Sequence, residues 1–169
     1  MRKVTVVLTY PRKCLIGAKA ISWWIGKPYS HAAAVITSDG LGLDLVYHAA
    51  QGMVHFMSGD NFKTINNTIV SIELTLTDEQ YKKLLVRCIS LAGQPYGYLE
   101  LAKILINDIT HRLGFSFKFK DSRGYICSEL LADLLQELGF VFNKPLYLVT
   151  PDDIEKAAIV YGKAKIERY

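Results

Sequence analysis

The sequence contains little cysteine and lacks the long apolar runs that membrane spans need. Three cysteines are present, an odd number without CxxC spacing, so neither a disulfide framework nor a zinc site is predicted. The longest apolar stretches, around 99–106 and 130–138, are interrupted by charge well before the roughly eighteen residues of a transmembrane helix. We therefore expect no membrane-spanning segment.

The chain also has only a small excess of basic over acidic residues. Twenty Lys and Arg stand against sixteen Asp and Glu, a formal net charge of +4, and the basic residues are scattered apart from short clusters. A nucleic-acid partner would require a basic face, so none is expected. The apolar run at 4–8 is too short for the core of a signal peptide. The expected location is the cytoplasm, with export by a phage or host route as the alternative.

What the chain does contain is enough apolar sequence for a core: 169 residues, 50% of them hydrophobic. Short β-branched or alternating runs predict strands at 4–8, 31–37, 45–49, 53–57, 69–76 and 159–166. Helical spacing and capping residues predict helices at 15–25, 77–92, 98–107, 127–138 and 150–157, with a loop at 114–123. No repeat or linker divides the chain, so we expect one α+β domain over residues 1–169, an antiparallel sheet packed against helices.

Cys127 is the most informative candidate for chemistry, because it stands in the first turn of an apolar helix. Backbone N–H groups and the helix dipole stabilise an anion there, which predicts a thiol pKa below the usual value of about 8.5 and a place for an oxyanion. The alternative is a small apolar residue inside a helix. Cys88, in mid-helix, is expected in the core, and Cys14 is a weaker candidate nucleophile.

A thiol nucleophile needs a base, and His31 is the best candidate. It opens a predicted strand and is followed by three alanines that leave space for a substrate. His48, on the next strand, should reach the His31 ring and fix its tautomer. The alternative for His31 is a histidine that only hydrogen-bonds a turn at the start of a strand. We interpret His55 and His111 as structural or exposed.

The order of motifs resembles a known family. PYSHAAAVI, LVYHAAQGMVHF, GQPYGYLEL, YICSELLADLLQELGF and VTPDDI follow one another as in the circularly permuted branch of the NlpC-type papain-like cysteine hydrolases. That branch includes YiiX-like proteins and, more distantly, relatives of lecithin retinol acyltransferase. The resemblance spans roughly residues 4–154, and its most specific pieces are the Ser-His that opens a strand and the Cys-Ser-Glu-Leu that opens a helix.

The resemblance implies a papain-like fold with Cys127 as nucleophile, His31 as general base and His48 as the residue that orients it. YiiX-like members usually have glutamate in the third place, whereas a histidine there is similar to other NlpC-type and acyltransferase-type relatives. Tyr96 and Tyr98 would line the pocket or help bind the oxyanion, although packing is the alternative for both. The residues expected at the substrate site are thus Ser30, Tyr96 and Tyr98.

The implied reaction is acyl transfer through a thioester, without a metal or organic cofactor. The expected partner is a peptide, a peptidoglycan fragment or an acyl substrate, and an amide or isopeptide hydrolase is the first interpretation. Two alternatives stay open: a lipid or protein acyltransferase or deacylase, and a catalytically silent binding or virion module. Trp23, Trp24 and Ile25 beside Lys27 suit an acyl chain or membrane surface, or else form a helix face packed on the sheet.

Overall fold

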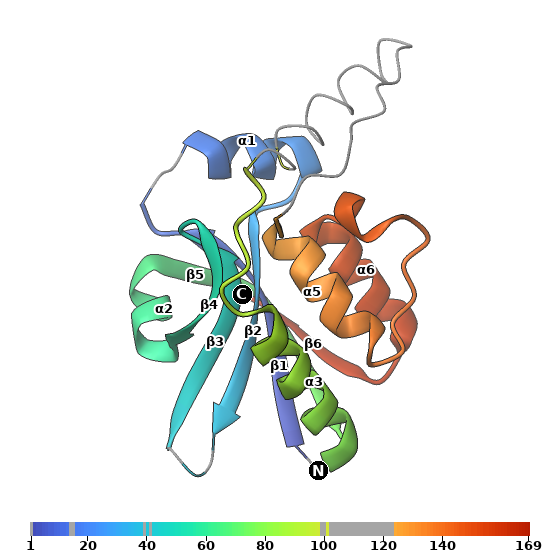
Figure 1. Cartoon of the computed structure of the whole chain (residues 1–169). Helices are drawn as coiled ribbons and strands as arrows, with labels where there is room; N and C mark the ends of the chain where they lie inside the picture. The colour runs from blue at the N-terminus through green and yellow to red at the C-terminus, as the bar shows by residue number, and fades with distance from the viewer. Residues whose placement is uncertain (1, 14–15, 39, 41, 99–100, 102–123) are drawn as a thin grey trace.

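The computed structural model describes residues 2–13, 16–38, 40, 42–98, 101 and 124–169 of the chain. These residues form an α+β structure around one six-stranded sheet, in which every pair of neighbouring strands is antiparallel (Figure 1). The order in the sheet is β4-β3-β2-β1-β5-β6. The strands are β1 (Arg2–Pro11), β2 (His31–Ser38), β3 (Leu43–Ala50), β4 (Met53–Ser58), β5 (Asn66–Leu76) and β6 (Ala164–Arg168). The expected α+β class is confirmed, as is the meander of β2, β3 and β4.

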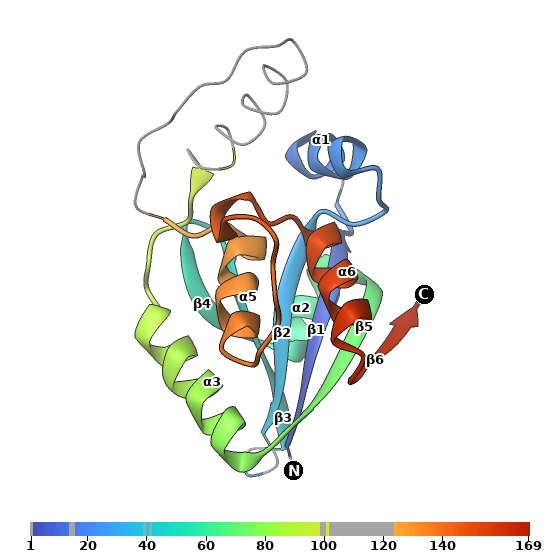
Figure 2. The same cartoon turned by 90° about the vertical axis from the view of Figure 1, so that its right-hand side faces the viewer.

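Helices cover both faces of the sheet (Figure 2). The helices α3 (Asp78–Leu91), α5 (Cys127–Gln136) and α6 (Pro151–Tyr161) lie on one face, and α2 (Gly59–Ile65) lies on the other. A short 3₁₀ turn, η1 (Leu146–Leu148), precedes α6. The remaining helix, α1 (Ile16–Ile25), lies beyond the ends of the strands and covers neither face. In the described part of the chain, no helix has the length and hydrophobicity needed to cross a bilayer.

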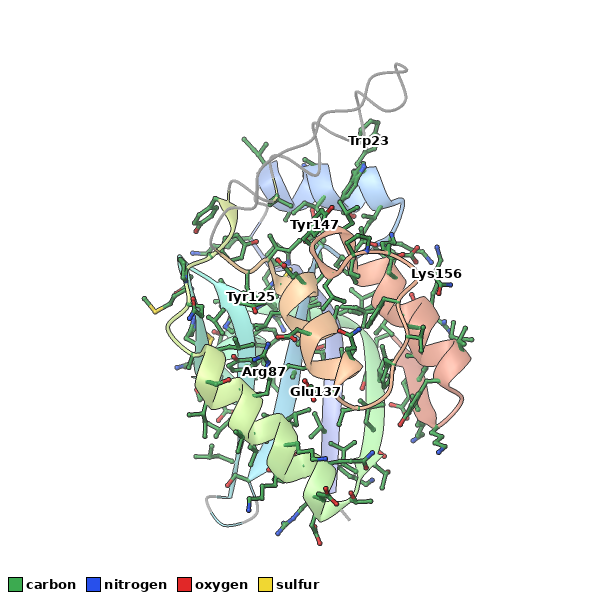
Figure 3. All side chains as sticks on the ribbon, turned by 45° about the vertical axis from the view of Figure 1, so that its right-hand side comes forward. Trp23, Arg87, Tyr125, Glu137, Tyr147 and Lys156 are labelled. Carbon is green, nitrogen blue, oxygen red and sulfur yellow. The ribbon has the colours of Figure 1, made fainter. Side chains whose placement is uncertain are left out.

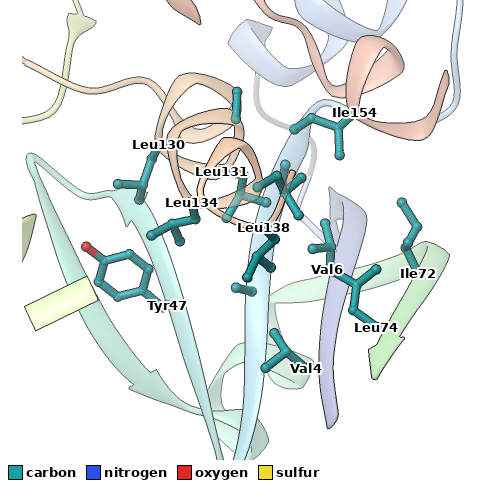
Figure 4. Packing of buried hydrophobic residues seen from close by; sticks show 14 of the residues in the cluster. Val4, Val6, Tyr47, Ile72, Leu74, Leu130, Leu131, Leu134, Leu138 and Ile154 are labelled. Carbon is teal, nitrogen blue, oxygen red and sulfur yellow. The ribbon is translucent and has the colours of Figure 1, made fainter. Parts of the chain in front are cut away.

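The main core lies between the sheet and α5. Leucines spaced three and four residues apart in α5 point at the sheet, where they meet Tyr47 of β3 and the alternate residues of β1 and β5 (Figure 4). Leu130, Leu131 and Leu134 are each at most 1% exposed. Burying a side chain of this size stabilises the fold by about 1.5–3 kcal/mol. A smaller cluster on the other face, between the sheet and α2, consists of Val7, Ala33, Val46 and Phe62.

The capping motifs are confirmed where the sequence predicts them. Thr77 and Gln80 exchange the two hydrogen bonds of a capping box at the start of α3. Thr150 and Asp153 do the same for α6, with Pro151 at its first position. The end of α6 differs from the prediction, because nothing stops the helix before Gly162, whose φ of 68° closes it. The predicted strand 159–166 is therefore wrong in its first half, and β6 begins at Ala164.

Two further predictions differ from the structure or lie outside it. The short helix α2 has no counterpart in the prediction, although Ser58 caps it by accepting a hydrogen bond from the N–H of Asn61. Its seven residues place a single large side chain, Phe62, into the core. The predicted helix 98–107 and loop 114–123 lie outside the described residues, except for Tyr98 and Leu101.

Candidate active site

Cys127 is the first residue of α5, and its side chain is nearly buried. The preceding residue, Ile126, has no polar side chain to cap the helix, so the first N–H groups lack a side-chain acceptor. The backbone N–H groups of Ala32, Ser128 and Cys127 itself interact with the sulfur and lower the thiol pKa. Burial acts in the opposite direction and is the largest effect, so the pKa of Cys127 is raised overall. The expected depressed pKa of Cys127 is wrong, because burial of the thiol raises the pKa by more than the backbone N–H groups at the helix start lower it.

The start of α5 is held in place by its second residue. The Ser128 hydroxyl donates a 2.6 Å hydrogen bond to the carbonyl of Val149, just before α6. This buried bond links the helix that carries the thiol to the segment that leads into Pro151. Both Ser128 and Pro151 lie beside the cavity that contains Cys127. The position of the sulfur therefore depends on α6 as well as on α5.

His31 and His48 are hydrogen-bonded to each other, as the sequence predicts. The atoms are His31 Nε2 and His48 Nδ1, 3.0 Å apart, and the rings meet edge to face. His48 is 1% exposed, and its Nε2 has no hydrogen-bond partner among the described residues. Phe62 of α2 packs edge-on against the His48 ring, with 5.4 Å between centroids. In the tautomer in which the Nε2–H of His31 donates to His48, Nδ1 is the ring nitrogen of His31 that can take a proton from a nucleophile.

Both histidines of this pair are neutral at neutral pH. Burial lowers the pKa of His31 to about 4, with a smaller contribution from the charge of His55. Burial also lowers the pKa of His48 to about 3, helped by the charges of His31 and His55. A neutral imidazole can act as a base, so His31 is in the correct protonation state to accept a proton. His55 hydrogen-bonds the Met53 carbonyl at 3.2 Å, which agrees with a structural role.

The imidazole pair and the thiol approach β2 from different sides. Side chains alternate along the strand, so Ala32 faces α5, while His31 faces α2 and lies near Phe62. The sulfur interacts with the N–H of Ala32, the residue directly after His31. Across the residues that the structure describes, no hydrogen bond joins the Cys127 thiol to the His31 ring. The thiol and the His31 ring are therefore separated by the strand, and the structure does not bring the expected nucleophile and base together.

A mainly apolar cavity opens at Cys127. Ser30 and Tyr96, two of the three residues expected to bind substrate, line it, and Ile21 and Trp24 of α1 form another part of its wall. The pKa of Tyr96 is raised, first by burial and then by the nearby Cys127, so its hydroxyl stays protonated. The third expected residue, Tyr98, is exposed and does not line the cavity. Its ring rests against Tyr96, with 4.5 Å between centroids, which is the packing alternative.

Part of this wall was missed by sequence reasoning. The Trp-Trp-Ile patch is divided in the structure. Ile25 is partly buried and packs against the main core, as the packing alternative expects, whereas Trp24 lines the cavity and Trp23 is exposed. The helix lies past the strand ends, where only its inner side, with Ile21 and Trp24, meets the cavity. Phe62 was missed as well, because α2 was not predicted. The polar cap at Ser58 ahead of a short apolar stretch is the signal that could have found it.

The remaining candidate residues are Cys88, Cys14 and His111. Cys88 is fully buried in α3, as expected, and burial raises its thiol pKa to about 12. Cys14 and His111 lie outside the described residues. Within the described ranges, no group of three His, Cys, Asp or Glu side chains could hold a metal ion.

Comparison of the chain with models of known protein families finds no match, and comparison with curated protein sequences finds none. The features of this chain that bear on its function are therefore the geometry around Cys127 and the motifs that resemble the NlpC-type hydrolases.

Proposed function

We propose that the chain is a cysteine hydrolase that cleaves an amide or isopeptide bond, with a circularly permuted papain-like fold of the NlpC type. The substrate class that suits this chemistry is a peptide, including the peptides of bacterial cell walls. One observation carries the proposal: the Cys127 sulfur lies in a cavity at a helix start, with three backbone N–H groups around it. Beside it runs β2, which begins at His31, and His31 is hydrogen-bonded to His48 of the next strand, β3.

The roles of the three residues follow from their atoms. With its Nε2–H donated to His48, His31 would take the proton of the Cys127 thiol at Nδ1 when substrate binding brings the ring and the sulfur together. His48 is a positioning residue, which holds the His31 ring in that tautomer. The thiol pKa is raised and the His31 pKa is lowered, so a preformed thiolate–imidazolium pair is disfavoured. Proton transfer then accompanies attack, as in general-base catalysis.

The reaction would proceed in two halves. The sulfur bonds to the carbonyl carbon while its proton moves to His31, and the oxyanion accepts hydrogen bonds from the N–H groups at the start of α5. Each such donor is typically worth about 3–4 kcal/mol. The C–N bond then breaks, the amine leaves with the proton from His31, and a thioester to Cys127 remains. Water, deprotonated by His31, attacks the thioester and releases the acid and the thiol.

A second candidate function is a lipid or protein deacylase or acyltransferase. It uses the same thioester, and the observation that favours it is the apolar wall formed by Ile21, Trp24 and Ile126 beside the sulfur. An acyl chain would bury its methylene groups there, each worth about 0.8 kcal/mol.

Two measurements test the proposal. Iodoacetamide alkylation of Cys127, followed by intact mass, should slow about tenfold or more in His31→Ala. His55→Ala is the matched control, because His55 is a neighbouring histidine without a hydrogen bond to His31. Incubation with peptidoglycan fragments, and separately with phospholipids, should give an acyl adduct that Cys127→Ala lacks, and its mass distinguishes the two candidate functions. An alkylation rate independent of His31, with no adduct, would indicate a silent binding module instead.

A further inference from the structure

The helix α1 combines an apolar sequence with an outer side that is exposed to solvent. It carries one charged residue in ten, Lys19, yet none of its residues is buried. Ile16 and Trp23 are 88% and 85% exposed, among the most exposed large apolar side chains described. A helix of this composition is normally covered by protein or lipid. An exposed apolar surface of this kind marks an interaction site.

The exposed apolar residues share the outer side of the helix. Ile16, Ala20 and Trp23 follow one another at spacings of four and three, so they form one stripe. Figure 3 shows Trp23 pointing outward from α1, away from the sheet. On the inner side, Ile21 and Trp24 line the cavity of Cys127. The outer stripe is therefore separate from the proposed active site.

The charge around α1 is of one sign. Residues 11–28 contain four basic residues and no Asp or Glu. Lys27 pairs with Asp152 at 3.1 Å, whereas Lys19 is exposed on α1 itself. Arg12, which donates a hydrogen bond to the Lys63 carbonyl, and Lys13 are exposed in the segment before the helix. Basic residues that flank an exposed apolar stripe attract anionic lipid headgroups, and tryptophan favours the membrane–water interface. This combination favours a lipid surface over a second copy of the chain, whose α1 would bring the same positive charge.

We propose that α1 docks on an anionic lipid bilayer. Ile16 and Trp23 enter the boundary between headgroups and acyl chains, and Arg12, Lys13 and Lys19 contact the headgroup phosphates. Docking brings the cavity next to the membrane, because the inner side of the same helix lines it. Only this last consequence, delivery of a membrane-borne substrate to Cys127, rests on the proposed function.

Tryptophan fluorescence gives a direct readout, because both tryptophans of the chain lie in α1. The full chain is titrated with phosphatidylcholine vesicles, with and without phosphatidylglycerol, and binding is also measured by co-sedimentation. We expect a blue shift and co-sedimentation with the anionic vesicles, weakened by salt. Trp23→Ser should weaken partitioning about tenfold or more. Lys19→Gln should weaken it about fivefold, the effect of one charge near an anionic surface.

The control variant is Val160→Ser, which changes an equally exposed apolar residue on α6 and should leave binding unchanged. Absence of a blue shift, equal binding to neutral and anionic vesicles, or an equal loss in the control would overturn the proposal. Self-association without lipid that Trp23→Ser abolishes would assign α1 to a second copy and would also overturn it. Cys127→Ala should bind vesicles like the wild type, so failure of the hydrolase proposal and failure of docking are separate results.

Discussion

Mild acid should destabilise this protein through two buried histidines. His48 is 1% exposed, and His31 is hydrogen-bonded to it, so neither imidazole can take up a proton without placing a charge in an apolar setting. Burial lowers the pKa of His31 to about 4 and that of His48 to about 3, from the ordinary 6.5. A lowered histidine pKa means that the unfolded chain binds protons more readily than the folded chain, so stability falls as the pH falls below about 6.5.

The magnitude follows from linkage. At about pH 5 each of these histidines is almost fully protonated in the unfolded chain but mostly neutral in the folded chain. This difference lowers the unfolding free energy by about 2 kcal/mol for each histidine. The pair therefore removes about 4 kcal/mol of unfolding free energy between about pH 8 and pH 5. That is a large share of the typical 5–15 kcal/mol of a domain. Carboxyl groups, with ordinary pKa values near 4, contribute little in this window.

Urea unfolding at about pH 8, 6 and 5 measures this effect, and the midpoint should fall steeply with pH. His48→Leu removes the more deeply buried group and should remove about half of the pH dependence. His55→Gln serves as the control for loss of a histidine, and this variant should keep most of the pH dependence of stability. The reasoning is refuted if the wild-type unfolding free energy stays constant between about pH 8 and 5, or if His48→Leu has the wild-type slope.

Three further predictions concern stability and thiol reactivity. Asp133→Ala breaks the bidentate ion pair that Arg87 of α3 makes with Asp133 of α5 at 2.8–3.1 Å. We expect the unfolding free energy in urea to fall by about 1–3 kcal/mol, and an unchanged midpoint would contradict this. Gly124→Ala would place a Cβ 2.9 Å from the Gly97 Cα, so we expect a lower Tm, corresponding to a loss of about 1–3 kcal/mol of stability. A wild-type Tm would show that the two segments at Gly97 and Gly124 can move apart without cost. Under native conditions a thiol reagent should not label Cys88, whose pKa is raised to about 12, and labelling at this position in the folded protein would disprove its burial.

The local predictions succeeded because their signals lie within a few residues. The signals in question are the capping box at Thr77, the cap at Thr150 with Pro151 after it, and the alternation of Val70, Ile72 and Leu74. Each needs only backbone geometry and side-chain spacing. The proximity of His31 and His48 was predictable for the same reason, since the two strands are joined by one short connection. The predicted strand at 159–166 failed because its apolar residues fit a helix equally well until Gly162.

By itself, then, the sequence determined the order of the six strands and of α1, α3, α5 and α6, the place of Cys127 at a helix start, and the pairing of two histidines on adjacent strands. Only the tertiary structure decided that burial raises the Cys127 pKa, that His31 faces α2 rather than α5, and that Ile16 and Trp23 of α1 lie in solvent. The reason is physical: hydrogen-bonding and spacing preferences act along the chain, whereas desolvation depends on which distant segments cover a residue, and no local pattern records that.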